Sequence, residues 1–294
     1  MKTENLRIDL VALKELLAAQ YGVSSPRLVF SPVGGDSWCF RAGVLWVSVR
    51  RDRQGHVPES YEAAAALSEQ GLTFVLAPLR GKDQHVVHRI AEHPVVVSPY
   101  VPGAPLHATT APEVSAVAAV VSQLHAATAC VPVPHEEYRF PFQEELDHAL
   151  STALWHDPQA GPYSQRTHRL IRAHRAYLDS LQAEAQRLAR YCRRHTGEPV
   201  LTHGEPNGNV LRTDDGRLLL FDWGTTALGP PERDWWALAS QSASLTCRPE
   251  FVRFYHLRWI LGEVAEYTER FMHKHVGDRD DAAMWSELWQ YFPH

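Results

Sequence analysis

The sequence predicts an α+β protein with a β-rich N-terminal lobe and a larger, mainly helical C-terminal lobe. Short apolar segments separated by glycine turns fill most of the first hundred residues. Long stretches of helical periodicity follow Pro102-Gly103, and only one strand pair interrupts them. We therefore expect an N-terminal lobe over 1–102, a link between the lobes at about 98–102, and a C-terminal lobe over 103–294.

The N-terminal elements follow from local patterns. The opening stretch MKTENLRIDLVALKELLAAQYG has helical spacing, and LVFSPVGGDSWCFRAGVLWVSVRR alternates strand and turn signals. An alanine-rich helix is expected over 60–72, closed by Gly71. Further strands are expected in TFVLAPLR (73–80) and HVVHRIAEHPVVVSPYV (85–101), which gives an antiparallel sheet with a helix against it.

The C-terminal elements are longer. A helix is expected over 111–128, with Pro112 in its first turn, and more helix over 165–195 and toward the end of the chain. The stretch 129–164 is expected to be irregular, partly helical and aromatic. Two short strands flank the turn Asp214-Asp215-Gly216, which predicts one hairpin.

Composition narrows the function classes. The chain has 294 residues and 45% apolar content, with 29 lysine and arginine against 34 aspartate and glutamate, a net charge of −5. This charge gives no bulk attraction to nucleic acid or to anionic membranes, and no run of about 18 apolar residues exists to span one. The start does not resemble a signal peptide, and the four cysteines are scattered. A cytoplasmic protein with reduced thiols is the expectation.

The hairpin carries the clearest chemical signal. The loop LTHGEPNGNV leads into its first strand, and LLLFDWGTT contains the end of its second. Because these two ends are neighbours in an antiparallel pair, Glu205, one of Asn207 or Asn209, and Asp222 should converge. An amide oxygen and a carboxylate suit Mg²⁺ that keeps water and phosphate oxygens as its other ligands. A separate carboxylate can orient and deprotonate a hydroxyl, so these groups favour phosphoryl transfer.

The motifs THGEPNGNVL, LLLFDWGTTALGPPERDWW and YVPG resemble those of the aminoglycoside phosphotransferase and choline kinase-like family. The resemblance extends to FVLAPL, QLHAAT and the tail FYHLRWILGEVAEYTERF, and is strongest to spectinomycin- and viomycin-type antibiotic kinases. It implies a protein-kinase-like fold that binds ATP or GTP with Mg²⁺. It also implies transfer of the γ-phosphate to a hydroxyl of a small molecule.

The resemblance assigns roles to matching positions. Glu205 stands where the family has its catalytic base, which is usually aspartate. Asn209 and Asp222 stand at the two metal ligands. His203 matches a histidine that packs the loop, and Asp234 a residue that braces the loop backbone.

The resemblance also places the nucleotide. Gly34, Gly35 and Ser37 are expected in the turn that covers the phosphates, where glycine lets the backbone approach the oxygens. The base is expected at hinge residues Ser98, Tyr100 and Val101. Nothing in the hinge separates adenine from guanine.

Two positions depart from the family pattern. Ser48 occupies the strand position of the phosphate-gripping lysine. Arg50 lies two residues on, on the same strand face and about 7 Å away, so it is the expected substitute. Glu62 on the following helix is expected to hold this arginine. In addition, the interval from Glu205 to Asn209 is one residue shorter than usual, which leaves Asn207 as an alternative ligand.

The acceptor is expected against the helical lobe. Tyr255, Trp259 and Glu263 recur every four residues and share a helix face, and acidic and aromatic residues over 135–148 could form a rim. Such a surface suits a cationic or sugar-like ligand.

Three functions remain open at this point. The leading interpretation is a kinase that confers antibiotic resistance by phosphorylation. The alternatives are a kinase of a metabolite such as an amino alcohol, and a nucleotide-binding pseudokinase.

Overall fold

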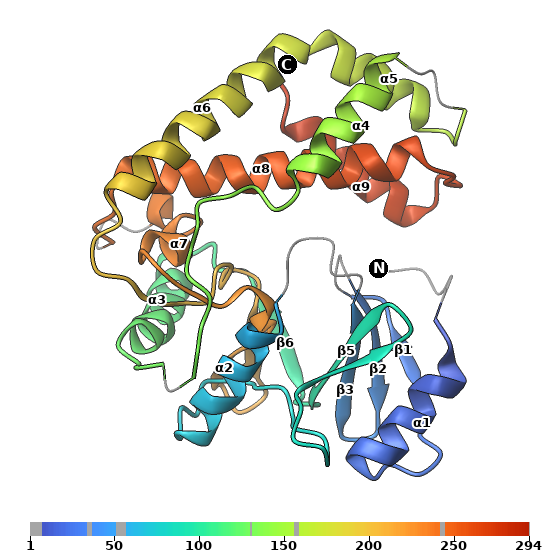
Figure 1. Cartoon of the computed structure of the whole chain (residues 1–294), viewed down its shortest axis with the longest axis vertical. Helices are drawn as coiled ribbons and strands as arrows, with labels where there is room; N and C mark the ends of the chain where they lie inside the picture. Colours follow the sequence, from blue (N-terminus) through green and yellow to red (C-terminus); the bar gives the residue numbers. More distant parts are fainter. Residues whose placement is uncertain are drawn as a thin grey trace. The chain divides into compact units, whose positions relative to one another are not determined.

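The computed structural model describes residues 8–33, 37–50, 57–129, 131–155, 159–241 and 245–293. The chain forms two compact units (Figure 1). The first combines Met1–Glu136 with Gly197–Cys247, and the second combines Glu137–Thr196 with Arg248–His294. The hairpin around Asp214-Asp215-Gly216, called the catalytic hairpin below, thus belongs to the same unit as the β-rich N-terminal segment. The expected lobe boundary at residue 102 stays a prediction.

A five-stranded antiparallel sheet dominates the N-terminal segment. Its strand order is β1-β2-β3-β5-β4. The strands are β1 (Val29–Ser31), β2 (Ser37–Ala42), β3 (Leu45–Arg50), β4 (Val87–Ile90) and β5 (His93–Pro99).

One face of this sheet is apolar and is covered by helix α1 (Leu10–Tyr21). Leu13 and Leu17, one turn apart, are fully buried against strand side chains such as Val47. Asp9 caps the start of the helix, where its carboxylate accepts from two backbone amides, and Gly22 caps the end in a left-handed conformation. The expected opening helix is confirmed.

The opposite face of the sheet is polar at one end. Strand register places Ser37 opposite Arg50 and Cys39 opposite Ser48, and residues directly opposite each other share a face. The core-facing residues of both strands are their alternate neighbours. The sheet therefore presents two hydroxyls and a guanidinium on the face that α1 does not cover.

The rest of the first unit forms a second core. The small sheets have the orders β6-β8-β9 and β10-β7 and pack with α2 and α3. The elements are α2 (Pro58–Glu69), β6 (Gly103–Leu106), α3 (Ala111–His125), β7 (Val200–Thr202), β8 (Val210–Thr213), β9 (Leu218–Leu220), η1 (Trp223–Thr225), β10 (Ala227–Gly229), α7 (Glu232–Trp235) and η2 (Ala239–Gln241). The two predicted helices and the predicted hairpin are confirmed.

The strand predicted over 73–80 is wrong. Among these residues only Val75 forms a bridge, with Leu220. Four residues later, the amide of Leu79 donates to the carbonyl of Val97 in the other sheet. The segment crosses from one sheet to the other, so it has no continuous ladder partner.

The second unit is helical. Its helices are α4 (Gln143–Trp155), α5 (Ser164–Ala173), α6 (Arg175–Arg194), α8 (Pro249–Met272) and α9 (Arg279–Gln290). Helix α8 is central, because each of the other four packs against it. The observed α+β fold, with an antiparallel N-terminal sheet and a mainly helical remainder, confirms the predicted class. Within the described ranges, no helix is long and apolar enough to cross a bilayer.

Candidate active site

The two ends of the catalytic hairpin meet as predicted. The amide of Phe221 donates to the carbonyl of Asn209 at 3.0 Å, so Asp222 follows directly on the residue bonded to Asn209. Asp222 adopts a left-handed backbone conformation, with φ of 61°. This conformation is uncommon for a residue other than glycine, and such strain occurs preferentially at functional sites. The chain thus holds the Asp222 carboxylate beside the end of the catalytic loop.

Arg50 reaches this carboxylate from the five-stranded sheet. Its Nη1 atom lies 3.0 Å from Asp222 Oδ1. The arginine side chain is 6% exposed and that of Asp222 is 39% exposed, so one partner is buried and the other is accessible. The end of β3 and the predicted metal-binding carboxylate therefore form one charged cluster.

The expected partner of Arg50 is wrong. Glu62 instead accepts from Arg80 at 2.7 Å, and Arg80 also bonds Glu69. Both acids lie on α2, while Arg80 follows the segment that crosses between the sheets. Arg80 thus forms the ion pair with the helix glutamate, and Arg50 pairs with Asp222 instead.

The other predicted phosphate contacts lie beside Arg50. Ser48 shares its strand face, and Cys39 lies 3.4 Å from Ser37 Oγ and 3.8 Å from Ser48 Oγ. Burial raises the pKa of the Cys39 thiol, so it stays protonated at neutral pH. Gly34 and Gly35 lie outside the described residues.

The predicted hinge is ordered by aromatic stacking. Ser98 pairs with Trp46 across the sheet, and the amide of Tyr100 donates to the carbonyl of Val44. The Tyr100 ring stacks on Trp46 and lies 4.0 Å from the Arg41 guanidinium. Val101 is half-buried. The contacts of these residues to a base remain predictions.

Asp234 braces the start of the catalytic loop. Its carboxylate accepts the amide hydrogens of His203 at 3.1 Å and Gly204 at 2.6 Å, and the ring of His125 at 2.8 Å. Burial alone raises the pKa of this fully buried carboxyl, but the His125 hydrogen bond and nearby positive charges outweigh burial and lower it. An ionised carboxylate thus fixes the backbone just before Glu205.

His203 is held as a neutral ring. Its Nε2 atom donates to the carbonyl of Phe221 at 2.8 Å, and its Nδ1 atom accepts from the amide of Glu205 at 3.3 Å. Complete burial lowers its pKa in spite of the neighbouring Asp234. Since both ring nitrogens are engaged by backbone, His203 packs the loop and has no nitrogen left to carry a substrate proton.

The loop also depends on glycine at position 204. Gly204 has φ of +103°, and a Cβ there would lie 2.6 Å from the Arg233 guanidinium. Arg233 is itself fixed by Glu136 at 3.0 Å and by Thr202 at 2.9 Å. The buried ion pair between Arg233 and Glu136 was not predicted from the sequence, because these two residues are far apart in the chain.

Backbone partners distinguish the two asparagines. Asn207 Oδ1 accepts from the amide of Ala108 at 2.9 Å, whereas Asn209 Nδ2 donates to the carbonyl of Glu205 at 2.8 Å. A backbone amide requires an oxygen opposite it and a carbonyl requires a nitrogen, so both side-chain orientations are fixed. The side-chain oxygen of Asn207 is therefore bonded to a backbone amide, whereas the side-chain oxygen of Asn209 points away from the carbonyl that binds its nitrogen.

The donor set fits magnesium better than a transition metal. Among the described residues, no group of three or more histidine, cysteine or acidic side chains gathers to hold a metal. Mg²⁺ needs only one or two protein oxygens when phosphate and water complete its shell. The Asn209 amide oxygen and the accessible Asp222 carboxylate match that requirement.

The acceptor candidates belong to the second unit. Tyr255 is 2% exposed and packs beside Phe254 inside the helical core, contrary to its expected ligand-facing position. Trp259 is half-buried against Tyr291, and Glu263 is also half-buried. Trp259 and Glu263 as acceptor contacts remain predictions.

The chain is similar to known phosphotransferases in sequence and in fold. The sequence pattern of the phosphotransferase enzyme family, abbreviated APH, matches residues 44–292. Protein StrN of Streptomyces griseus is 46% identical over 279 residues, which cover 91% of this chain and 87% of StrN.

Two solved structures show the fold. Spectinomycin phosphotransferase APH(9)-Ia, in complex with ADP and spectinomycin, has a TM-score of 0.72 at 14% identity and covers 99% of this chain and 96% of its own. Choline kinase LicA of Streptococcus pneumoniae has a TM-score of 0.56 at 12% identity, over 96% and 98% of the two chains. The predicted protein-kinase-like fold is confirmed.

Proposed function

The chain belongs to the phosphotransferase enzyme family and phosphorylates hydroxyl groups, and we propose that it transfers the γ-phosphoryl group of ATP or GTP to a small-molecule antibiotic. The observation that carries the proposal is the meeting of Asn209 and Asp222 at the hairpin ends, next to the braced loop that contains Glu205. The likeness in fold to a spectinomycin phosphotransferase that binds ADP and spectinomycin supports an antibiotic as the acceptor.

Glu205 is the proposed base. It is exposed, and the loop before it is fixed through the contacts of Asp234 and His203. The acceptor oxygen forms a bond to the γ-phosphorus while the bond to the β–γ bridging oxygen breaks, and Glu205 takes the hydroxyl proton. The nucleoside diphosphate is the leaving group. Positioning supplies most of the rate in phosphoryl transfer, so glutamate in place of aspartate is compatible with catalysis.

Asn209 and Asp222 are the proposed ligands of Mg²⁺, which when bound would neutralise the phosphate oxygens. Asn209 holds its amide oxygen outward because its nitrogen is bonded to the loop backbone. Asp222 presents its carboxylate from a strained backbone position.

Arg50 is the proposed replacement for the missing strand lysine. Its guanidinium carries the charge that Ser48 lacks, and it already lies against Asp222. A guanidinium binds phosphate oxygens in a bidentate manner, so one residue can contact the phosphates and keep Asp222 in place.

The test is a phosphorylation assay on the full chain. The protein is incubated with Mg²⁺, ATP or GTP, and separate antibiotics and amino alcohols, and products are identified by a mass gain of one phosphate group. We expect an antibiotic product that is lost in Asp222→Asn and retained in Asp214→Asn, a matched control in the exposed hairpin turn. Phosphorylation of only an amino alcohol would instead identify a metabolite kinase. Nucleotide binding that needs no metal, with no product from any acceptor, would identify a pseudokinase.

A further inference from the structure

A polar groove opens between helices α4 and α6 of the second unit. Both helices pack against α8, and the space left between them has a volume of about 560 Å³. This volume lies within the range of small-molecule sites in proteins. The groove belongs entirely to the second unit, whereas Glu205, Asn209 and Asp222 belong to the first.

The helices line the groove with polar stripes. On α4, Gln143 and Asp147 lie one turn apart, and on α6 the same spacing brings Gln182, Gln186 and Arg190 onto one side. Phe140 and Ala189 add a smaller apolar surface, and polar side chains make up most of the lining residues. Its walls therefore offer hydrogen-bonding groups to a ligand.

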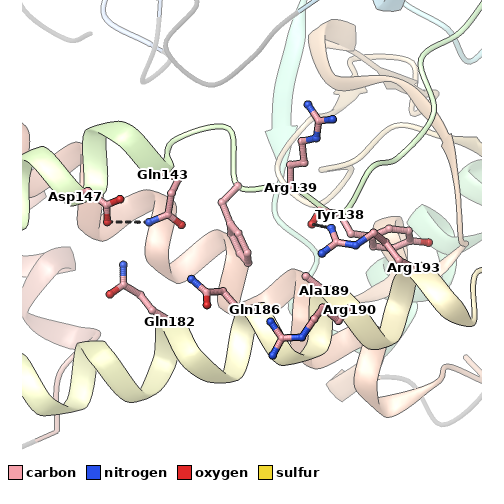
Figure 2. Close-up of a pocket in the computed structure, with 10 residues that line it drawn as sticks. Tyr138, Arg139, Gln143, Asp147, Gln182, Gln186, Ala189, Arg190 and Arg193 are labelled. Atoms are coloured by element: carbon pink, nitrogen blue, oxygen red, sulfur yellow. Dashed lines mark hydrogen bonds between the residues drawn. The ribbon is translucent and has the colours of Figure 1, made fainter.

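The groove has two chemically different ends. Figure 2 shows Gln143, Asp147 and Gln182 toward one end. Arg190 and Arg193 lie near Tyr138 at the other end, whereas Arg139 points away from them and pairs with Glu137 at 2.9 Å.

Amides both donate and accept hydrogen bonds, as recognition of several hydroxyls requires. Guanidinium groups instead favour a phosphate or carboxylate. Each end of the groove therefore suits a different part of one ligand.

The cationic end is anchored to the fold. Arg193 Nη1 donates to the carbonyls of Glu137 at 3.2 Å and Tyr138 at 3.0 Å. Tyr138 is buried, has φ of 53°, and packs against the α8 ring of Phe254. One guanidinium nitrogen of Arg193 thus stabilises the strained turn at Tyr138, and the other N–H groups of the guanidinium remain for a ligand.

From this arrangement we propose that the groove binds a phosphomonoester of a polyhydroxylated ring, such as a sugar phosphate or a cyclitol phosphate. The arginines take the phosphate, and the amides and Asp147 take the ring hydroxyls. Arg190 and Arg193 outnumber the single carboxylate of Asp147, and Arg139 is already paired with Glu137, so the groove carries a net positive charge and does not suit an amine-rich antibiotic. The site stands independently of the proposed phosphotransfer reaction.

The test is isothermal titration of the full chain without nucleotide or magnesium. The probes are glucose 6-phosphate, myo-inositol 1-phosphate, glucose and inorganic phosphate. At least one phosphomonoester is expected to bind about tenfold or more tightly than phosphate or free sugar, because it engages both ends. Equal affinity for phosphate alone, or no binding of either phosphomonoester, overturns the proposal.

Variants locate the site. Arg190→Gln is expected to weaken phosphomonoester binding by about tenfold or more, and Gln186→Leu to bring its affinity near that of phosphate alone. Arg187→Gln, on the same helix but outside the groove, is the charge-matched control and should leave the affinity unchanged. Both arginines are exposed, so folding is not at stake. Unchanged binding in Arg190→Gln with loss in Arg50→Gln would assign the probe to the nucleotide site and contradict the proposal.

Discussion

Replacing Arg50 by glutamine should weaken nucleotide binding without weakening magnesium binding. The side chain is 6% exposed and its guanidinium lies 3.0 Å from Asp222. A hydrogen bond that involves a charged group contributes about 1.5–3 kcal/mol, which corresponds to roughly 10- to 150-fold in affinity. Because the Asp222 carboxylate is 39% exposed and partly screened, we expect the lower part of this range, about 10- to 30-fold.

The assay is calorimetric binding of ADP at several magnesium concentrations. Removal of a positive charge beside Asp222 should leave magnesium affinity unchanged or higher, while the Kd for nucleotide rises. Arg50→Lys should recover part of the loss, since it restores charge but not the planar fork. Arg89→Gln, on the same sheet and exposed, is the control. If Arg50→Gln lowers the melting temperature but leaves the nucleotide Kd unchanged, Arg50 is structural and the reasoning fails.

Other residues of the site give separate predictions. Asn209→Ala should raise the magnesium concentration for half-maximal activity by about tenfold or more, measured by metal titration of turnover. Asn207→Ala should leave that value unchanged and lower the free energy of unfolding by about 1–2 kcal/mol, because a backbone amide loses its acceptor. If Asn207→Ala instead raised the magnesium requirement and Asn209→Ala only lowered stability, Asn207 would be the metal ligand. Asp234→Asn should lower the free energy of unfolding by about 3 kcal/mol in denaturant titrations, since it breaks a buried charge network; a change within error would contradict the bracing role. His203 has a folded-state pKa below its ordinary value of 6.5, so the unfolded chain takes up the proton first. Its contribution to stability is therefore complete above pH 6.5 and declines as pH falls below it, and His203→Gln should flatten this part of a melting-temperature profile.

The hairpin and its polar ends could be predicted because their signals are local. The turn at 214–216 and the apolar strands around it fix which ends are neighbours. This alone places Asn209 beside the residue that precedes Asp222. The helices over 60–72 and 111–128 were predictable for the same reason, from periodicity within a single segment.

Pairings between distant segments could not be predicted. Arg50 and Asp222 are 172 positions apart, and the choice between Asp222 and Glu62 as its partner depends on where Arg80 lies. Likewise, His125 stands in a motif visible in the sequence, but its contact with Asp234 appears only in the fold.

The strand expected over 73–80 failed for a related reason. Its residues favour extended backbone, yet the segment passes between two sheets and finds only single partners in each. The β-propensity of its residues predicts an extended backbone, but it does not predict which strands the segment pairs with.

The central claim is that Glu205, on the loop braced by Asp234, is the base for phosphoryl transfer. Its most direct test is the turnover of Glu205→Gln with an acceptor that the wild-type protein phosphorylates, with the Kd for ADP and magnesium measured on the same sample. Removal of a general base predicts a fall in kcat of about 10²- to 10⁴-fold with nucleotide affinity unchanged. A kcat close to that of the wild type, in a variant that binds nucleotide normally, would contradict the claim.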